Sequence, residues 1–379
     1  MKVVQTTVRK GAATTADFAS LAAIEPSLVL VFGSVDALRQ SAAAIAEAFP
    51  QAQRAGCSTA GEITGKGVED GTLVVTALHF DQTRMAQVST VLAGMDDSFA
   101  AGKRLATGLP IAGLRAILIF GQGVQINGSA VLSGMTEIVG SKVPITGGLA
   151  GDGGAFAQTW VLDDKGVSSD RLTCVGLYGD ALQFAHGSFG GWSPFGPARK
   201  VTRSENNVLF ELDGESALEV YKRYLGEHAS GLPASGLLFP FAMLGSDHSE
   251  VGLIRTILGV DDASGSLTLA GDIDPNGYLR LMHASTDALV DGAEAAAEAA
   301  KAMQGSAGQG LALLVSCVGR KLVMGGRVDE EVEAVGEVFG QGATLAGFYS
   351  YGEISPFTAG VECKLHNQTM TITYISEAV

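Results

Sequence analysis

The chain has 379 residues, of which 46% are hydrophobic and 17% charged, and its formal net charge is -15. This composition suits a globular protein with a substantial core and excludes a largely disordered chain. Because nucleic acids and anionic membrane surfaces attract clustered Lys and Arg, we expect neither nucleic acid nor a membrane as a main partner.

The cysteines and the N-terminus indicate the compartment. The chain has four cysteines, which lie far apart and form no CxxC pair. The usual signatures of zinc ribbons, thioredoxin-type sites and covalent c-type haem are therefore missing, and buried reduced thiols are expected. The N-terminal segment lacks the apolar stretch of a signal peptide, and no apolar run is long enough to span a membrane. These features predict a cytoplasmic protein.

The first predicted unit begins with the apolar segment SLVLVFG, residues 27–33, which is typical of a buried strand. Ser34 then caps a predicted helix, which ends at Pro50. The chain continues through the small-residue stretch AGCSTAGEITG, residues 55–65, into a second strand, TLVVTALHF.

The same order of elements recurs twice. The strand RAILIFG, residues 115–121, precedes a helix and the segment VPITGGLAGDG, and the strand LALLVSC, residues 311–317, precedes the helix DEEVEAVGEVFG and the segment TLAGFYSYGEI. Each copy carries a glycine followed by an acidic residue, at Gly61-Glu62, Gly151-Asp152 and Gly352-Glu353, with the second copy the loosest. We predict an α/β fold of two related domains, with mixed β-sheets flanked by helices and internally duplicated strand–helix–strand units.

The middle third of the chain differs from these units. The Gly/Pro-rich segment 187–214 predicts an ordered loop leading into a strand, and a helix follows from residue 215. Residues 265–285 predict a β-hairpin whose Asp-Pro-Asn-Gly turn spans 274–277. We place the domain boundary here, with one domain over residues 1–205 and the other over 206–379.

Catalytic motifs fail on their details. The segment GEITGKG has Gly67 where a phosphate-binding loop needs Ser or Thr, and GQGVQIN has Ile126 at the third glycine of a dinucleotide fingerprint. Ser58 lacks the glycine that a nucleophile elbow requires two residues later. We therefore predict no catalytic residue and no enzyme. The repeated glutamates are expected to accept hydrogen bonds from backbone N–H groups of their turns.

Three histidines are candidates for the axial ligand of a haem, at most one of them serving. His186 lies at a strand end beside glycines and aromatic residues. His283 alternates with Leu279 and Leu281, which predicts that it faces the same apolar side, and His366 is expected to share a strand face with the residues two and four positions later. An imidazole that faces an apolar pocket suits haem iron. Each histidine also fits an ordinary surface or core position.

One basic cluster stands out in the acidic chain. Arg199, Lys200 and Arg203 follow a loop that contains Trp192 and Phe195. Together these residues suit a pocket for a carboxylate or a haem propionate. A solvated strand edge is the alternative interpretation.

Several segments resemble one family. GCSTAGEI resembles the characteristic turn of the FIST N domain, and LAGFYSYGEI with the later HNQTMT resembles the end of the FIST C domain. GGLAGD and GGWSPFGPARKVTRSENNVLFELDG are also similar to FIST sequences, so the resemblance covers nearly the whole chain. It implies a cytoplasmic sensory module for a small ligand. One branch, the NosP-type haemoproteins, senses nitric oxide and regulates histidine kinases or cyclic-di-GMP enzymes in trans.

The resemblance leads to two main hypotheses. In the first, haem b binds in an apolar pocket through one of the three histidines, and nitric oxide weakens the iron–histidine bond and shifts a two-state arrangement. In the second, an amino acid or similar metabolite binds, its carboxylate paired with Arg199, Arg203 or Arg255 and its amine with a buried glutamate. An enzyme of unknown chemistry is a third alternative. The implied partner in trans is a histidine kinase or a cyclic-di-GMP enzyme. The sequence is also compatible with a homo-oligomer.

Overall fold

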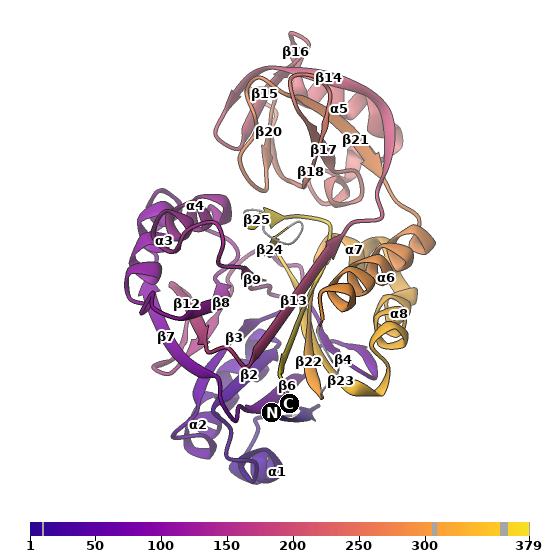
Figure 1. The fold of residues 1–379 in the computed structure, drawn as a ribbon. Coiled ribbons are helices and arrows are strands. Elements are labelled where there is room, and N and C mark those ends of the chain that lie inside the picture. The colour runs from indigo at the N-terminus through magenta and orange to yellow at the C-terminus, as the bar shows by residue number, and fades with distance from the viewer. Residues whose placement is uncertain (10, 305–308, 357–362, 379) are drawn as a thin grey trace.

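The computed structural model describes residues 1–9, 11–304, 309–356 and 363–378 (Figure 1). The chain forms two bodies. The core body comprises residues 2–189 and 286–377, and the inserted domain comprises residues 193–283. Both combine β-sheet with helices, and the predicted mixed α/β fold with repeated strand–helix–strand units is confirmed.

The core body is built from three copies of one unit: an edge strand, a helix, a central strand, one or more helices, a parallel strand, a hairpin and a return strand. The first copy contains β1 (Lys2–Val8), η1 (Thr15–Phe18), α1 (Ala19–Ala22), β2 (Leu28–Gly33), α2 (Val35–Ala48), β3 (Gln53–Ser58), β4 (Glu62–Thr64), β5 (Gly67–Glu69) and β6 (Leu73–His79). The second contains β7 (Arg84–Val91), η2 (Met95–Asp97), α3 (Ser98–Thr107), β8 (Leu114–Gly121), α4 (Gly128–Val139), β9 (Ile145–Leu149), β10 (Val161–Asp163), β11 (Gly166–Ser168) and β12 (Arg171–Tyr178).

The third copy is interrupted by the inserted domain after its edge strand. It contains β13 (Leu182–Phe189), α6 (Thr286–Met303), β22 (Gly310–Cys317), α7 (Val318–Met324), η5 (Gly325–Arg327), α8 (Asp329–Phe339), η6 (Gly340–Gly342), β23 (Ala343–Ser350), β24 (Gly352–Pro356), β25 (Cys363–His366) and β26 (Met370–Glu377). The three predicted copies are therefore present, and each is longer than the sequence pattern indicated.

The copies exchange their hairpins. The described residues form three six-stranded sheets in the core body, ordered β1-β6-β2-β3-β10-β11, β25-β24-β9-β8-β12-β7 and β13-β26-β22-β23-β4-β5. In each sheet the hairpin comes from another copy: β4 pairs with β23, β24 with β9, and β10 with β3. The exchange closes a ring, and each Gly-acidic turn marks the point where the chain crosses to the next sheet.

Three equivalent glycines show how closely the parallel strands are packed. Gly56, Gly147 and Gly347 lie at matching positions in β3, β9 and β23. A Cβ atom at any of them would lie 1.8–2.0 Å from a backbone carbonyl oxygen of the neighbouring central strand. Gly56 and Gly147 also have positive φ angles, of 156° and 136°. Glycine is required at these positions because a side chain has no room there.

The three sheets meet in one apolar core. Phe32 of β2, Phe120 of β8 and Phe348 of β23 form an aromatic cluster with ring centroids 4.7–6.3 Å apart.

Ser34 caps α2 as predicted, accepting a hydrogen bond from the Ala37 N–H at 3.3 Å. All four cysteines are among the described residues; they are buried, and none of them forms a disulfide there.

The inserted domain differs from its predicted elements. It contains β14 (Ser193–Glu205), β15 (Val208–Leu212), β16 (Glu215–Ser216), α5 (Ala217–Leu225), η3 (Gly226–Gly231), η4 (Ala234–Leu238), β17 (Phe241–Leu244), β18 (Glu250–Arg255), β19 (Ile257–Asp261), β20 (Ser266–Leu269) and β21 (Tyr278–His283). Much of the predicted loop over 187–214 is therefore strand. The predicted boundary at 205/206 falls between β14 and β15.

The predicted hairpin over 265–285 is wrong. The turn itself forms, because the Gly277 N–H donates to the Asp274 carbonyl oxygen at 3.2 Å. However, β20 pairs with β15 and β19, whereas β21 pairs with β14 and β17. Pairing with sequence-distant strands overrides the local turn signal.

Across the described ranges, no helix has both the length and the apolar character needed to cross a membrane.

Candidate functional site

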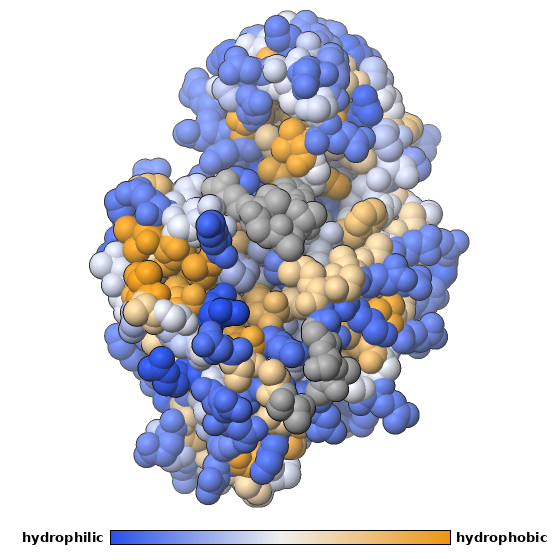
Figure 2. All heavy atoms as spheres, viewed as in Figure 1, coloured by the Kyte–Doolittle hydropathy of each residue, from blue (hydrophilic) through white to orange (hydrophobic). Residues whose placement is uncertain are grey.

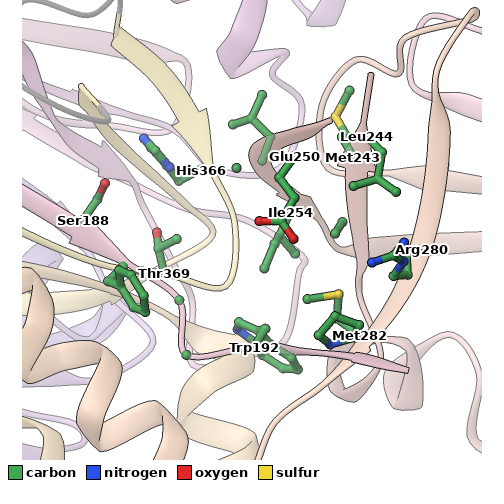
Figure 3. Close-up of a pocket in the computed structure, with 17 residues that line it drawn as sticks. Ser188, Trp192, Met243, Leu244, Glu250, Ile254, Arg280, Met282, His366 and Thr369 are labelled. Atoms are coloured by element: carbon green, nitrogen blue, oxygen red, sulfur yellow. The ribbon is translucent and has the colours of Figure 1, made fainter. Parts of the chain in front are cut away.

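A pocket of about 310 Å³ lies where the inserted domain meets the core body. We call it the interdomain pocket. The core side is formed by the end of β13, the linker at 190–192, β25 and Thr369, and the opposite side by β17, β18 and β21 (Figure 3). In the space-filling view, apolar surface also gathers on the lower rim of the inserted domain, where it faces the core body (Figure 2).

Most of the pocket wall is apolar. The Trp192 indole N–H donates to the Gln368 carbonyl oxygen at 2.7 Å, which fixes the ring at the base of the pocket. Met243, Ile254 and Met282 contribute the wall of the inserted domain (Figure 3). Methionine side chains adapt to the shape of a guest, so this wall suits an apolar group of variable outline.

Two charged side chains of the inserted domain also line the pocket. Arg280 lies on β21, and its Nε atom is buried with no hydrogen-bond partner in the described part of the chain. Glu250 is exposed and begins β18. An arginine and a glutamate in one small pocket provide opposite charges for a guest that carries both an anionic and a cationic group.

The core side supplies polar groups. The Ser188 Oγ atom is buried and, within the described ranges, has no hydrogen-bond partner. The His366 Nε2 atom lies 2.8 Å from the Ser355 carbonyl oxygen, and burial lowers the pKa of His366 to about 4. The imidazole is therefore neutral near pH 7. The Thr369 hydroxyl donates to Glu353 at 3.1 Å.

The structure brings two of the predicted site residues, Trp192 and His366, into this pocket. The other histidines lie outside the set that lines it. His186 is buried in β13 with its Nδ1 atom unpartnered among the described residues, and burial lowers its pKa to about 4. His283 ends β21 and is exposed, with Phe195 edge-on at 5.9 Å. His283 follows Leu279 and Leu281 at alternate positions of β21, but it is exposed whereas both leucines are buried, so it does not share their apolar surroundings.

The expected strand face of His366 is also wrong. His366 ends β25, and β26 begins only at Met370. Between them Gln368 has a φ of 63°, so the chain turns and the two strands join different sheets. The segment from 363 to 377 is therefore two strands, and His366 shares no strand face with Gln368 or Met370.

The predicted arginines separate into two groups. Arg199 pairs with Asp213 at 3.1 Å, and Arg203 pairs with Glu211 at 3.5 Å. Both partners belong to the inserted domain, and neither arginine lines the interdomain pocket. Arg255 is buried and lines a neighbouring cavity. Arg280 was not predicted, although a single arginine within the apolar strand YLRLMH was a usable signal.

The repeated glutamates form matching hydrogen-bond sets. Glu62 accepts from the Thr72 N–H at 2.8 Å, and Glu353 accepts from the Thr369 N–H at 3.2 Å. Each also accepts from the hydroxyl of the same threonine and from a hydroxyl three residues earlier. Asp152 likewise accepts from the Ala157 N–H at 2.8 Å and from neighbouring N–H groups. The acidic side chains therefore accept backbone N–H groups as expected, but the donors to Glu62 and Glu353 lie 10 and 16 residues further along the chain, and only those to Asp152 are local.

The two links between the bodies share one anchor. Arg320 of α7 is fully buried and pairs with Glu331 of α8 at 2.7 Å. Its guanidinium also donates to the carbonyl oxygen of Gly190 in the outgoing linker and, at 2.8 Å, to that of Leu289 in α6, just after the returning linker. The inserted domain is thus joined to a buried ion pair of the core body next to the interdomain pocket.

Family models match most of the chain. The FIST N domain matches residues 27–215, and the FIST C domain matches residues 217–356. The chain belongs to the FIST family. FIST domains are sensor domains of signal transduction that bind small ligands. In this FIST protein the boundary between the two matches falls inside the inserted domain, so both matches contribute to both bodies.

Other comparisons are more distant. An uncharacterized protein of Methanocaldococcus jannaschii is 26% identical over 222 residues, which are 53% of this chain and 41% of that relative. The FIST protein thus spans less than half of the relative's length. Cyanuric acid hydrolase from A. caulinodans aligns over 100% of both chains with 9% identity and a TM-score of 0.33, and a second cyanuric acid hydrolase structure covers 99% of both with 11% identity and 0.34. At these values the likeness supports no inference about activity.

Proposed function

We propose that this FIST protein is a small-ligand sensor whose interdomain pocket binds an amino acid or a similarly small zwitterion. The observation that carries the proposal is Arg280, whose buried Nε atom has no partner among the described residues. A ligand carboxylate would pair with Arg280 and a ligand amine with Glu250. The apolar part of the ligand would lie against Trp192 and Met282. The pocket volume of about 310 Å³ is at the lower end of the range for small-molecule sites, roughly 300–1,000 Å³, which favours a small metabolite.

A ligand in this position would report its presence through the relative placement of the two bodies. Arg280 and Met282 belong to the inserted domain, whereas His366 and Ser188 belong to the core body. A guest that contacts both sides binds best to one arrangement, and it shifts the population toward that arrangement by its differential affinity. The linkers at 190–192 and 284–285 are the segments in which such a movement would occur.

Isothermal titration calorimetry with a panel of amino acids tests the proposal. At least one member is expected to bind the wild-type protein. Arg280→Gln removes a charge-assisted hydrogen-bond donor worth about 1.5–3 kcal/mol, so affinity should fall roughly ten- to a hundredfold. Trp192→Ala should also weaken binding. Arg203→Gln is the matched control, because Arg203 lies in the same domain and does not line the pocket. Binding that Arg280→Gln leaves unchanged would refute the proposed site.

Haem-dependent nitric-oxide sensing is the second proposal, and one residue favours it. His366 is a buried, neutral imidazole that lines the interdomain pocket, and neutral imidazole is the form that binds iron. Two observations give haem b less support than a zwitterion. The His366 Nε2 atom is already 2.8 Å from a carbonyl oxygen, and the predicted propionate partners Arg199 and Arg203 pair with carboxylates elsewhere.

Visible spectra decide between the two proposals. Haemin added to the purified protein should give no Soret band that depends on His366 if the pocket serves a zwitterion. A Soret band that shifts with nitric oxide and disappears in His366→Ala would favour haem.

Output through a histidine kinase or a cyclic-di-GMP enzyme in the cytoplasm is part of either proposal. It is tested by measuring the activity of such an enzyme with this protein in the presence and absence of the ligand.

A further inference from the structure

A second cavity, of about 270 Å³, lies beside the interdomain pocket and shares Met243 and Leu253 with it. We call it the arginine cavity. Arg255 of β18 lines it from the inserted domain, and Ser129 and Ser133 of α4 line it from the core body. Like the interdomain pocket, the arginine cavity is therefore bounded by both bodies.

Arg255 is a buried cation that forms no ion pair among the described residues, although the charge of the Asp272 carboxylate partly favours its protonated form. Its side chain and backbone are only 4% exposed. The guanidinium donates to the carbonyl oxygens of Asp272 at 3.1 Å, Ile254 at 3.2 Å and Leu365 at 3.2 Å, all of which are neutral acceptors. The ion pairs of the described residues do not include Arg255. By contrast, Arg320, which is also buried, pairs with Glu331 at 2.7 Å.

Within the described residues, some N–H groups of Arg255 make no hydrogen bond, and its positive charge has no ion-pair partner. A guanidinium has five N–H donors, and those of Arg255 make three hydrogen bonds. Removing a cation from water without a counter-ion is strongly unfavourable. Desolvation lowers the pKa of Arg255 to about 10, so the side chain is still charged near pH 7. An anion in the adjoining cavity would supply the missing charge and accept the remaining N–H groups.

The opposite wall offers further donors. Ser129 and Ser133 are one turn apart on α4, so their hydroxyls share a face of the helix. Ser129 lies in the first turn of this 12-residue helix, where the helix dipole favours negative charge. A Cβ atom at Gly271 would lie 3.0 Å from the Arg255 Nε atom and 3.3 Å from the Ser129 Oγ atom. The guanidinium and the hydroxyl therefore converge on one region.

Two carboxylates limit the charge of the guest. Asp272 and Asp274 also line the arginine cavity, together with Lys364. The Asp272 carboxylate accepts from the Asn127 side chain at 3.1 Å, and the Asp274 carboxylate accepts from the Asn276 N–H at 2.9 Å. These side chains are held by their own partners, yet they would repel a multiply charged anion. The cavity therefore favours a small oxyanion of low charge.

We propose that the arginine cavity is a second binding site, which holds a small oxyanion of low charge, such as a carboxylate or the monovalent form of inorganic phosphate, between Arg255 of the inserted domain and Ser129 and Ser133 of the core body. The anion would connect the two bodies and stabilise their observed arrangement. This site is separate from the interdomain pocket and does not depend on a ligand there.

Calorimetric titrations with acetate and with inorganic phosphate, in chloride buffer at constant ionic strength, test the proposal and distinguish the two anions. At least one should bind the wild-type protein. Arg255→Gln should weaken that binding roughly ten- to a hundredfold, and Ser133→Ala, which removes one neutral hydrogen bond, about two- to tenfold. Arg203→Gln should bind as the wild type does. The proposal is overturned if neither anion binds, or if Arg255→Gln binds equally well.

Two further variants keep the outcome decisive. If Arg255→Gln does not fold, the double variant Ser129→Ala, Ser133→Ala on α4 replaces it. Oxyanion binding to this double variant that is as tight as to the wild type overturns the proposal. Trp192→Ala changes the interdomain pocket and leaves the arginine cavity intact. Oxyanion binding that persists in Trp192→Ala, with amino-acid binding weakened, shows that the two sites are separate. A parallel weakening of oxyanion and amino-acid binding would contradict the proposed second site.

Discussion

Replacing Glu353 by glutamine should change how the stability of the protein depends on pH. Glu353 is fully buried at the third Gly-acidic turn. Burial raises the pKa of its carboxyl from 4.5 to about 8, and this effect outweighs the hydrogen bonds from Ser350 and Thr369, which lower it. Because the folded state binds this proton more tightly than the unfolded state does, the stabilising contribution is complete below about pH 4.5. It is lost as the pH rises through 8.

The size of the effect follows from the same values. Each pH unit between the unfolded and folded pKa values changes the free energy of unfolding by about 1.4 kcal/mol. Between pH 5 and pH 8 the ionisation of Glu353 therefore costs the wild-type protein up to about 4 kcal/mol. Glutamine carries no titrating proton and retains an oxygen that accepts from Ser350 or Thr369. The variant should gain stability relative to the wild type as the pH rises.

Urea unfolding at pH 5 and pH 8 measures the effect. The difference in free energy of unfolding between Glu353→Gln and the wild type should shift in favour of the variant by up to about 4 kcal/mol over this interval. Glu137→Gln is the control, because it makes the same change at an exposed glutamate of α4. A difference between Glu353→Gln and the wild type that stays constant from pH 5 to pH 8 would refute the reasoning.

Three other substitutions test the architecture. Glu331→Gln leaves Arg320 buried without its counter-ion and should lower the free energy of unfolding by about 3–5 kcal/mol in urea titrations; a loss below 1 kcal/mol would argue against this pair as the anchor. Gly347→Ala places a Cβ atom 1.9 Å from a carbonyl oxygen and should abolish the native circular-dichroism spectrum, whereas Gly342→Ala, with open space, should retain it. Ser34→Ala removes the α2 cap and should lower the free energy of unfolding by about 1 kcal/mol. An unchanged melting temperature would contradict a stabilising role of this cap.

Local patterns in the sequence were sufficient to predict the repeated strand–helix–strand units. The apolar strands, the α2 cap at Ser34 and the Gly-acidic turns all depend on neighbours in the sequence, and the structure contains them. The hairpin exchange could not be predicted in this way. The pairing of β4 with β23 joins residues 62–64 to residues 346–348, and nothing local specifies such a distant partner.

The candidate site was predictable only in part, for a similar reason. Trp192 and the Arg199–Arg203 cluster are close in sequence, but the extended strand β14 carries the arginines away at roughly 3.3 Å per residue. His366 and Trp192 come together because the turn at 367–369 brings the end of β25 next to the linker. Arg280 enters from a strand that pairs with β14 and β17. The pocket therefore exists only once the inserted domain is placed on the core body.

The most direct test of the central claim is a crystal structure of the protein with the tightest-binding amino acid from the calorimetric panel. We predict electron density for the ligand in the interdomain pocket, with its carboxylate within hydrogen-bonding distance of Arg280 and its side chain against Trp192. Ligand density elsewhere in the molecule, with the interdomain pocket filled only by solvent, would contradict the claim.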